Sequence, residues 1–502
     1  MSTGQRRAGV VLGYVNIVVK NLVNLVYTPM LLSFVGQADY GVFQSCASFI
    51  FSLSLLTFGF SEAYVRFYTI RRNEKSEQSI KVLNGTYLLM YLVITFVILV
   101  LGLYFASKAE WFFSSGFTGS QVKLAHALLQ LMTFNIALTV FSTVFDAYIL
   151  ANEQFKFQQT RQIATSLATP VIAYTLLKIG MGAIGVAIAQ LLITVILLGL
   201  NAKYSIIDLG MRFSVCNFDT RLFKTIAAFS AWIFANQICE LVNQNVPNIL
   251  LAALTSASVV AVFAVSVQVR QVFSSLSTTM SNVFIPKINR IVSTTDDNVE
   301  LTNLMTRVGR YQLILFCWVY GGFVVLGRFF IAEWAGAEFA PAYGLICFMT
   351  APFMIPLCQN TGIEIQRAKN KHKARSIVYL FMALVNIIIT FILAPRIGYW
   401  APALGYVVSM IFGPGLFMNW YYKNRIGLDI GYFWRHCLPV VFYGLISVIF
   451  ILLLELALPV SSWISFLFVG AAYTGIYLLF IWYRVASETE RLTISNKFAS
   501  LR

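Results

Sequence analysis

Residues 9–34 read GVVLGYVNIVVKNLVNLVYTPMLLSF, an apolar run that decides how the start of the chain is interpreted. A helix of about 20 apolar residues crosses the roughly 30 Å hydrocarbon core of a membrane. After a short break at residues 35–39, a second apolar run continues to Phe60, and basic residues follow from Arg66 to Lys75. We therefore predict that the chain begins with a transmembrane helical hairpin.

The composition extends this prediction to the whole chain. Of its 502 residues, 59% are hydrophobic and 11% are charged, whereas soluble domains have about 25% charged residues. The chain contains about fourteen apolar runs that are long enough to span a membrane. These observations exclude a soluble protein and predict an all-α, polytopic membrane protein with about 14 transmembrane helices.

The positive charge is unevenly distributed along the chain. The net charge is +16, and with the N-terminus in the cytoplasm most Lys and Arg residues fall in cytoplasmic loops, helix ends or tails. Such an asymmetry sets the orientation of membrane proteins, so we predict that both termini are cytoplasmic. The basic residues then act as topology signals beside the lipid bilayer, and we expect no nucleic-acid partner.

Two sequence fragments recur at one separation. Pro29 and Pro247 are as far apart as Lys178-Ile179-Gly180 and Arg396-Ile397-Gly398. Two like-oriented halves of six helices each, as in one class of transporters, account for this pattern. The predicted parts are an N-lobe with helices 1–6 at residues 1–206, a C-lobe with helices 7–12 at residues 207–425, helices 13 and 14 at residues 426–485, and a cytoplasmic tail at residues 486–502.

Polar residues recur at helical spacing on both helices of the first hairpin. They are Asn16, Lys20, Asn24 and Thr28 on the first helix, and Gln44, Ser48 and Ser52 on the second. A spacing of four residues places side chains on one helix face, and a polar face within a membrane must contact protein or water. An ammonium at the depth of Lys20 costs about 2.5–3.5 kcal/mol even on the most lenient scale. We therefore predict a polar cavity along this hairpin.

The predicted second hairpin, at residues 225–285, carries a similar set of polar residues. They are Asn236, Glu240, Asn243 and Gln244 on its first helix, and Arg270, Ser274, Thr278 and Ser281 on its second. Counting from the hairpin turns places Lys20, Glu240 and Arg270 near the midplane, where repeat transporters bind substrate. The predicted substrate-binding residues are Asn16, Lys20, Asn24, Gln44, Ser48, Asn236, Glu240, Asn243, Gln244, Arg270 and Ser274.

Each intramembrane charge also has a structural interpretation. Lys20 could be neutralised by Glu240, and Arg270 could form a static salt bridge with the same carboxylate. Glu240 and Asp146 are the candidates for ion coupling, although the position of Asp146 near a cytoplasmic helix end favours a solvated structural role.

Signals of catalysis and of metal binding are missing from the sequence. The seven cysteines form no Cys-x-x-Cys pair and the three histidines are scattered, so neither disulfides nor a metal site are expected. The chain has no Gly-rich phosphate loop, and the predicted outer loops are too short for an enzyme of glycan assembly. We expect no catalytic residue and no cofactor.

The first two predicted helices contain four short motifs. They are Tyr27-Thr28-Pro29-Met30-Leu31-Leu32, Gly36-Gln37-Ala38-Asp39-Tyr40-Gly41, Gly59-Phe60 and Ala63-x-x-Arg66. Through these motifs and its topology the chain resembles the bacterial polysaccharide or O-antigen flippases of the Wzx type. Those flippases belong to the superfamily that also holds the multidrug extruders and the peptidoglycan-precursor flippase.

The resemblance implies a fold of fourteen helices in two lobes, with a central cavity built from helices one, two, seven and eight. It also implies ion-coupled alternating access that moves an undecaprenyl-diphosphate-linked oligosaccharide across the bacterial inner membrane. The oligosaccharide would be a repeat unit of O-antigen, capsule or exopolysaccharide. Polysaccharide polymerases and ligases are then candidate partners.

The predicted cavity has a charge that suits such a substrate. Lys20 and Arg270 suit a diphosphate, which arginine can bind through two hydrogen bonds, and the amides and hydroxyls suit sugars. Glu240 departs from this pattern because it could bind a cation or a proton. The alternatives are a cation-coupled small-molecule or multidrug exporter of the same fold, a peptidoglycan-precursor flippase, and a membrane glycan-assembly enzyme or scaffold without transport.

Overall fold

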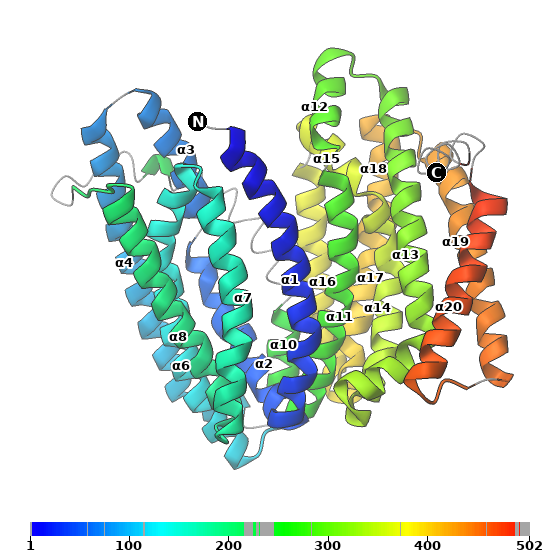
Figure 1. Ribbon diagram of the computed structural model, residues 1–502, viewed down its shortest axis with the longest axis horizontal. Helices are drawn as coiled ribbons and strands as arrows, with labels where there is room; N and C mark the ends of the chain where they lie inside the picture. The colour runs from blue at the N-terminus through cyan, green and yellow to red at the C-terminus, as the bar shows by residue number, and fades with distance from the viewer. Residues whose placement is uncertain are drawn as a thin grey trace. The chain divides into compact units, whose positions relative to one another are not determined.

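The protein is almost entirely helical (Figure 1). The computed structural model describes residues 3–57, 59–74, 76–113, 116–214, 224–226, 230, 245–282, 284–371, 373–457, 459–486 and 491. Within these ranges every regular element is a helix and no strand occurs. The prediction of an all-α protein is therefore confirmed.

Twelve helical segments of the described residues are long and apolar enough to cross a membrane. The fifth predicted span is also a helix, α7 (Phe155–Lys178), but it is not among the twelve, because residues 158–162 read QQTRQ. The seventh predicted span lies mostly outside the described residues, which include its last part as α10 (Val246–Leu254). The described segments confirm a polytopic membrane protein.

The expected first hairpin is present, but its second arm is divided. Its elements are α1 (Thr3–Val35), α2 (Gln37–Ser52), the 3₁₀ segment η1 (Leu53–Thr57) and α3 (Phe60–Asn73). Gly36 makes the turn between α1 and α2 with a φ of 80°, a value that glycine adopts without steric strain. A Cβ at Gly41 of α2 would collide with the backbone carbonyl of Ala257, so glycine allows these two segments to approach closely.

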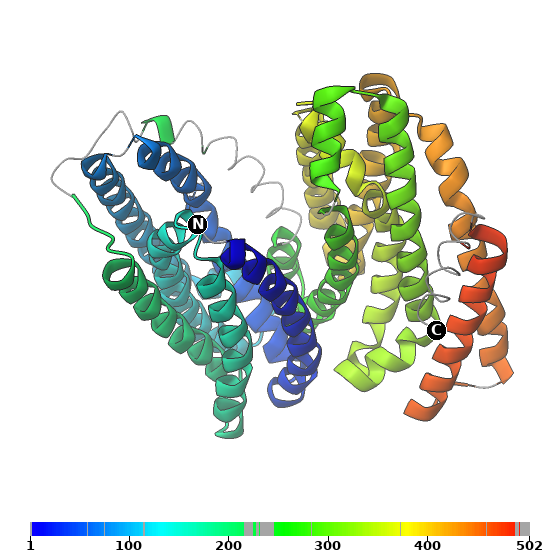
Figure 2. The same cartoon turned by 45° about the horizontal axis from the view of Figure 1, so that its top comes forward.

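Contacts divide the chain into two compact units, and the first, unit 1, comprises residues 1–264 and 391–399. Besides the first hairpin, α7 and α10, its elements are α4 (Glu77–Ser107), α5 (Ala109–Phe113), α6 (Gly119–Ala151), α8 (Gly182–Lys203) and the π-helical segment η2 (Tyr204–Asp208). Helices α4, α6, α8, α7 and α1 are neighbours in this order, and α2 packs against α6 and α10 (Figures 1 and 2). Unit 1 therefore packs α6, α8, α7 and α1 side by side.

The second unit, unit 2, comprises residues 265–390 and 400–502. Its elements include α12 (Ile285–Thr294), α13 (Asn298–Ala335), η3 (Ala337–Phe339), α14 (Ala340–Cys358), α15 (Asn360–Ala368), α17 (Trp400–Met410), η4 (Ile411–Met418), α18 (Asn419–Tyr421), η5 (Tyr422–Ile426), α19 (Ile430–Ala457), α20 (Trp463–Phe480) and η6 (Ile481–Val485). Helices α11 (Ala257–Asn282) and α16 (Lys373–Ile397) have residues in both units.

Helix α13 is the central helix of unit 2, because it packs against α14, α19 and α20. Two buried tyrosines of α20 attach to it: the Tyr473 hydroxyl donates to the carbonyl oxygen of Cys317 at 2.9 Å, and the Tyr477 hydroxyl donates to that of Ile314 at 2.7 Å. Buried tyrosine hydroxyls normally need such partners. The predicted helices 13 and 14, which are α19 and α20, are thus firmly held on α13.

The units and the predicted lobes are divided at different places. The predicted boundary after residue 206 falls inside unit 1, which continues to residue 264. The units are defined by contacts, whereas the lobes are defined by repeated sequence fragments, so the boundary of unit 1 does not test the predicted lobes. The division into two like-oriented lobes of six helices therefore stays a prediction.

Candidate functional site

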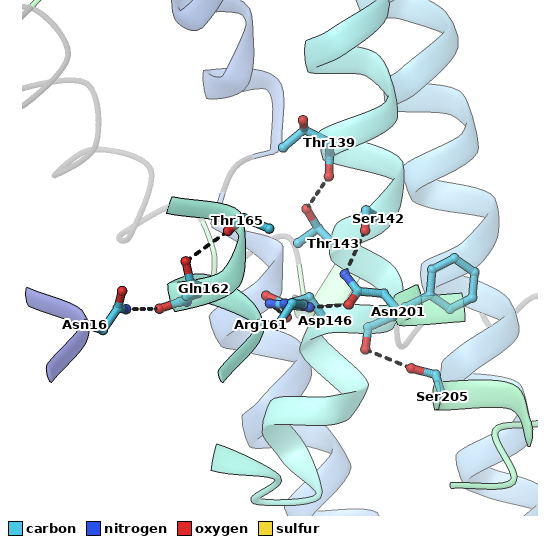
Figure 3. Close-up of polar contacts among 11 residues, drawn as sticks. Asn16, Thr139, Ser142, Thr143, Asp146, Arg161, Gln162, Thr165, Asn201 and Ser205 are labelled. Carbon is cyan, nitrogen blue, oxygen red and sulfur yellow. Dashed lines mark hydrogen bonds and ion pairs between the residues drawn. The ribbon is translucent and has the colours of Figure 1, made fainter. Parts of the chain in front are cut away.

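The predicted polar face of α1 has a packed part and an exposed part. Asn16 lies against α7, where its side-chain nitrogen donates to the side-chain oxygen of Gln162 at 2.7 Å (Figure 3). The same nitrogen also donates to the side-chain oxygen of Gln159 at 3.1 Å. Lys20 and Asn24 are exposed. The structure thus uses Asn16 in a helix contact and leaves Lys20 and Asn24 exposed.

Lys20 is an exposed charge within a candidate membrane span. Among the residues that the structure describes, none forms an ion pair with it. A cation within a membrane helix must be compensated by water, an anion or a polar partner. Thr28, about two turns further along the helix, is only 5% exposed, so the exposed part of this face is centred on Lys20 and Asn24.

The polar residues of α2 are engaged inside unit 1. The side-chain nitrogen of Gln44 donates to the Tyr40 hydroxyl at 2.7 Å. Ser48 is 5% exposed, and its hydroxyl accepts a hydrogen bond of 3.0 Å from the side-chain nitrogen of Asn248 on α10. Asn248 was not among the predicted site residues. Gln44 and Ser48 therefore have protein partners, and their role in substrate binding stays a prediction.

Arg270 of α11 is held by aromatic rings in unit 2. The guanidinium donates from Nη1 to the Tyr406 hydroxyl, and its central carbon lies 4.3 Å from the centre of the Tyr406 ring and 5.4 Å from that of Phe353. The residue is 7% exposed, and its Nε is buried without a hydrogen-bond partner among the described residues. These neighbours are neutral, so they hold Arg270 in place while its positive charge is retained.

The other predicted residues of the second hairpin are less completely described. Asn236, Glu240, Asn243 and Gln244 lie outside the described residues. Ser274 is half-buried, one helical turn after Arg270 on α11. The pairing of Glu240 with Arg270 therefore stays a prediction.

A chain of polar contacts joins α6, α7 and α8 in unit 1 (Figure 3). Arg161 of α7 forms an ion pair with Asp146 of α6, with 2.6 Å between Nη2 and Oδ1. The Nη1 of Arg161 donates to the side-chain oxygen of Asn201 on α8, and the nitrogen of Asn201 donates to the Ser142 hydroxyl at 3.0 Å. The Arg161 side chain is 10% exposed and that of Asp146 34%. Three helices are thus fastened through one guanidinium.

This network was only partly predictable from the sequence. Ser142 and Asp146 belong to the polar positions of α6, but Arg161 and Asn201 were not among the predicted residues. The signal for Arg161 was the polar first half of α7, because an arginine in a membrane helix needs a partner. The partner found is Asp146, a predicted candidate for ion coupling, whose carboxylate is balanced by the guanidinium.

Metal ligation finds no support in the described residues, which contain no group of three or more His, Cys, Asp or Glu side chains that could hold an ion. The polar groups described above are instead amides, hydroxyls, tyrosines and single charges. Such groups can recognise an anionic, hydroxyl-rich ligand.

The sequence is similar to that of a known membrane protein and of a known family. The sequence model of the family described as "Polysaccharide biosynthesis protein" matches residues 7–292. The chain is 21% identical over 486 residues to a Bacillus subtilis (strain 168) protein named "Uncharacterized membrane protein EpsK", and the alignment covers 94% of both chains.

The fold is shared with solved structures of flippases and transporters. A structure titled "Lipid II flippase MurJ, inward closed conformation" has a TM-score of 0.77 and 17% identity, covering 94% of this chain and 99% of that one. An inward-facing multidrug resistance MATE family transporter of the MOP superfamily has a TM-score of 0.55 and 13% identity, covering 81% of this chain and 94% of that one. At these identities the likeness shows the fold alone.

The family match covers more than half of the chain, and the fold agrees with it. The predicted resemblance to a family of polysaccharide-synthesis membrane proteins is thereby confirmed. The chain is a multi-pass membrane protein that belongs to the polysaccharide biosynthesis protein family.

Proposed function

We propose that this protein is a flippase that moves an undecaprenyl-diphosphate-linked oligosaccharide across the bacterial inner membrane by ion-coupled alternating access. The observation that carries the proposal is Lys20, an exposed cation on α1 without an ion-pair partner among the described residues. A diphosphate compensates such a charge through hydrogen bonds in which both groups are ionised. The family match supports a role in polysaccharide synthesis, with an O-antigen, capsule or exopolysaccharide repeat unit as cargo.

Arg270 supports the same substrate class. Its guanidinium is held by Tyr406 and Phe353, which are neutral, and its buried Nε has an unused hydrogen. Its charge therefore remains available to attract a phosphate. In this proposal Lys20 and Arg270 each contribute positive charge that attracts a diphosphate, and Asn24 is an exposed amide offered to sugars. Ser274 keeps its predicted role in substrate binding.

Ion coupling is assigned to Glu240 in this proposal. Asp146 is paired with Arg161 at 2.6 Å, so its carboxylate already has a counter-ion and we give it a structural role. A carboxylate that binds a proton or a cation in one state of the cycle and releases it in the other would couple the gradient to transport.

We further propose that both termini are cytoplasmic and that polymerases and ligases of the polysaccharide act after this protein. The positive residues at the predicted cytoplasmic helix ends support the orientation. The chain itself performs no catalysis in this scheme, and it moves its substrate unchanged.

The fold is compatible with two other functions. It is shared with a lipid II flippase and with a multidrug transporter, so a peptidoglycan precursor and a small molecule are the alternative cargoes. Both alternatives share the fold and differ in the ligand. The exposed lysine on α1 favours an anionic cargo over a cationic drug.

Deletion of the gene separates these functions. If the proposal holds, undecaprenyl-linked sugar units accumulate on the cytoplasmic leaflet, where a membrane-impermeant lectin cannot reach them in intact spheroplasts, and surface polysaccharide disappears. Normal surface polysaccharide together with raised drug sensitivity would establish the exporter instead. Arrest of cell-wall synthesis with lipid II trapped inside would establish the peptidoglycan-precursor flippase.

A further inference from the structure

Unit 2 contains a pocket of about 500 Å³ at the ends of α13 and α19, two helices that pack side by side. Its lining combines two opposite charges with five apolar side chains: Arg328, Glu455, Ile449, Leu452, Leu453, Leu456 and Pro459. The pocket plays no part in the function proposed above, because its residues are separate from every residue to which that proposal assigns a role.

The two charges of the pocket do not form a close ion pair. Arg328 and Glu455 interact electrostatically, but among the described residues no ion pair joins either of them to a partner. The nearby Tyr343 hydroxyl donates to the carbonyl oxygen of Val324 at 2.6 Å, so its hydrogen is already used. A ligand placed between Arg328 and Glu455 would meet one charge of each sign.

The position of Glu455 at the end of a helix favours binding of a positively charged ligand group to its carboxylate. The residue lies in the last turn of α19, which ends at Ala457, and the C-terminal end of a helix carries a partial negative charge that repels a carboxylate. Arg328 lies seven residues before Ala335, the last residue of α13, or about 10 Å along the helix axis. Both charges are therefore close to a helix end.

The apolar side of the pocket has the form of a lipid-facing stripe. Ile449, Leu452, Leu453 and Leu456 follow the spacing i, i+3, i+4, i+7, which places them on one face of α19. Their exposed fractions are 57%, 38%, 62% and 84%. In a membrane-spanning helix such a face contacts acyl chains, so the pocket has a charged end and an apolar side.

We propose that this pocket binds a zwitterionic phospholipid that carries a primary ammonium, of the phosphatidylethanolamine type. The Arg328 guanidinium holds the phosphate, the lipid ammonium donates hydrogen bonds to the Glu455 carboxylate, and the acyl chains lie along the stripe of α19. A choline headgroup has no N–H to donate to Glu455. An anionic headgroup leaves Glu455 unpaired and is repelled by it.

The test uses the purified full-length protein in detergent, with lipid retention measured by native mass spectrometry. Phosphatidylethanolamine, phosphatidylcholine and phosphatidylglycerol with identical acyl chains are added separately. We expect phosphatidylethanolamine to bind about tenfold more tightly than either of the others, which corresponds to about 1.4 kcal/mol. Equal retention of the three lipids, or a preference for phosphatidylglycerol, overturns the proposal without any variant.

Two variants and a matched control test the assigned contacts. Glu455→Gln should reduce the affinity for phosphatidylethanolamine to that for phosphatidylcholine, and Arg328→Gln should weaken all three lipids. Glu333→Gln, which removes an exposed acid of α13 outside the pocket lining, should leave the preference unchanged. Size-exclusion chromatography confirms that each variant is folded. A folded Glu455→Gln protein that keeps its full preference for phosphatidylethanolamine would refute the role of the carboxylate.

Discussion

Units 1 and 2 accommodate a buried arginine in different ways. In unit 1 the guanidinium of Arg161 meets the Asp146 carboxylate at 2.6 Å and also donates to Asn201. In unit 2 the guanidinium of Arg270 meets the Tyr406 hydroxyl and the faces of two aromatic rings. The first environment cancels the charge, whereas the second stabilises it and leaves it positive. The comparison shows that burial alone does not distinguish a cation with a structural role from a cation that can attract a ligand.

Lys20 extends the comparison to an exposed cation. Lys20→Glu should reduce transport about a hundredfold or more, because it removes a charge-assisted contact worth about 1.5–3 kcal/mol and adds repulsion of the diphosphate. Lys20→Arg should retain most of the activity. The measurement is surface polysaccharide in a deletion strain that carries each variant, with protein insertion checked by immunoblot of membranes.

Lys178→Glu is the matched charge reversal, since Lys178 is exposed at the end of α7 and is not a predicted site residue. It should leave surface polysaccharide unchanged. Equal polysaccharide in the Lys20→Glu and wild-type strains would remove Lys20 from the mechanism and with it the main support for an anionic substrate.

The charge balance of unit 1 predicts the largest effect on stability. Asp146→Asn leaves the Arg161 guanidinium, 10% exposed, without a counter-ion and should lower the free energy of unfolding by about 2–3 kcal/mol, below the range for fully buried pairs because Asp146 is partly exposed. Thermal and denaturant unfolding in detergent measure this change.

The double variant Asp146→Asn with Arg161→Gln should recover part of that loss, because no unpaired charge remains. Glu62→Gln, an exposed acid of the same unit, serves as the control and should change stability by less than about 0.5 kcal/mol. An Asp146→Asn protein as stable as the control variant would show that the pair contributes little.

The surroundings of Arg270 predict a smaller effect. Tyr406→Phe removes the hydroxyl that accepts from Nη1 but keeps the aromatic face, so it should destabilise unit 2 by about 1–2 kcal/mol. Tyr483→Phe, at a tyrosine that is 66% exposed, is the control. If Tyr406→Phe and the control unfold alike, the aromatic faces alone hold the guanidinium.

The contact between α2 and α10 predicts the smallest effect. Ser48→Ala removes the acceptor for Asn248, and hydrogen bonds between membrane helices contribute about 0.6 kcal/mol on average. A double-mutant cycle with Asn248→Ala measures the coupling of the two side chains. A coupling energy of zero would leave Ser48 free to act elsewhere, as the predicted role in substrate binding requires, and Ser33→Ala, at an exposed serine of α1, is the control.

The predicted residues of α1 show what sequence periodicity can predict and what it cannot. The spacing of Asn16, Lys20, Asn24 and Thr28 predicts that they share one helix face, but it does not say what that face meets. In the structure Asn16 contacts α7, Lys20 and Asn24 are exposed, and Thr28 is buried. The neighbours change along the face because packed helices cross at an angle. The spacing of residues within one helix cannot predict that angle.

The polar first half of α7 forms contacts that the sequence analysis did not predict. This helix is not among the twelve segments apolar enough to span a membrane, yet it is the helix whose Gln162 and Arg161 bind α1, α6 and α8. Asp146 and Asn201 lie on other helices, and their distance to Arg161 depends on packing. Arg161 was not singled out from the sequence, and only the structure showed that Asp146 is its partner.

The sequence by itself determined that this protein crosses a membrane many times as helices. This follows because the hydrocarbon core offers no hydrogen bonds to the backbone, so each apolar run must satisfy its own amides and carbonyls within a helix. Only the tertiary structure decided which charges are cancelled and which remain. Asp146 meets Arg161 while Arg270 meets tyrosine, since electrostatic interactions depend on distances between residues on separate helices, and those distances are set by how the helices pack.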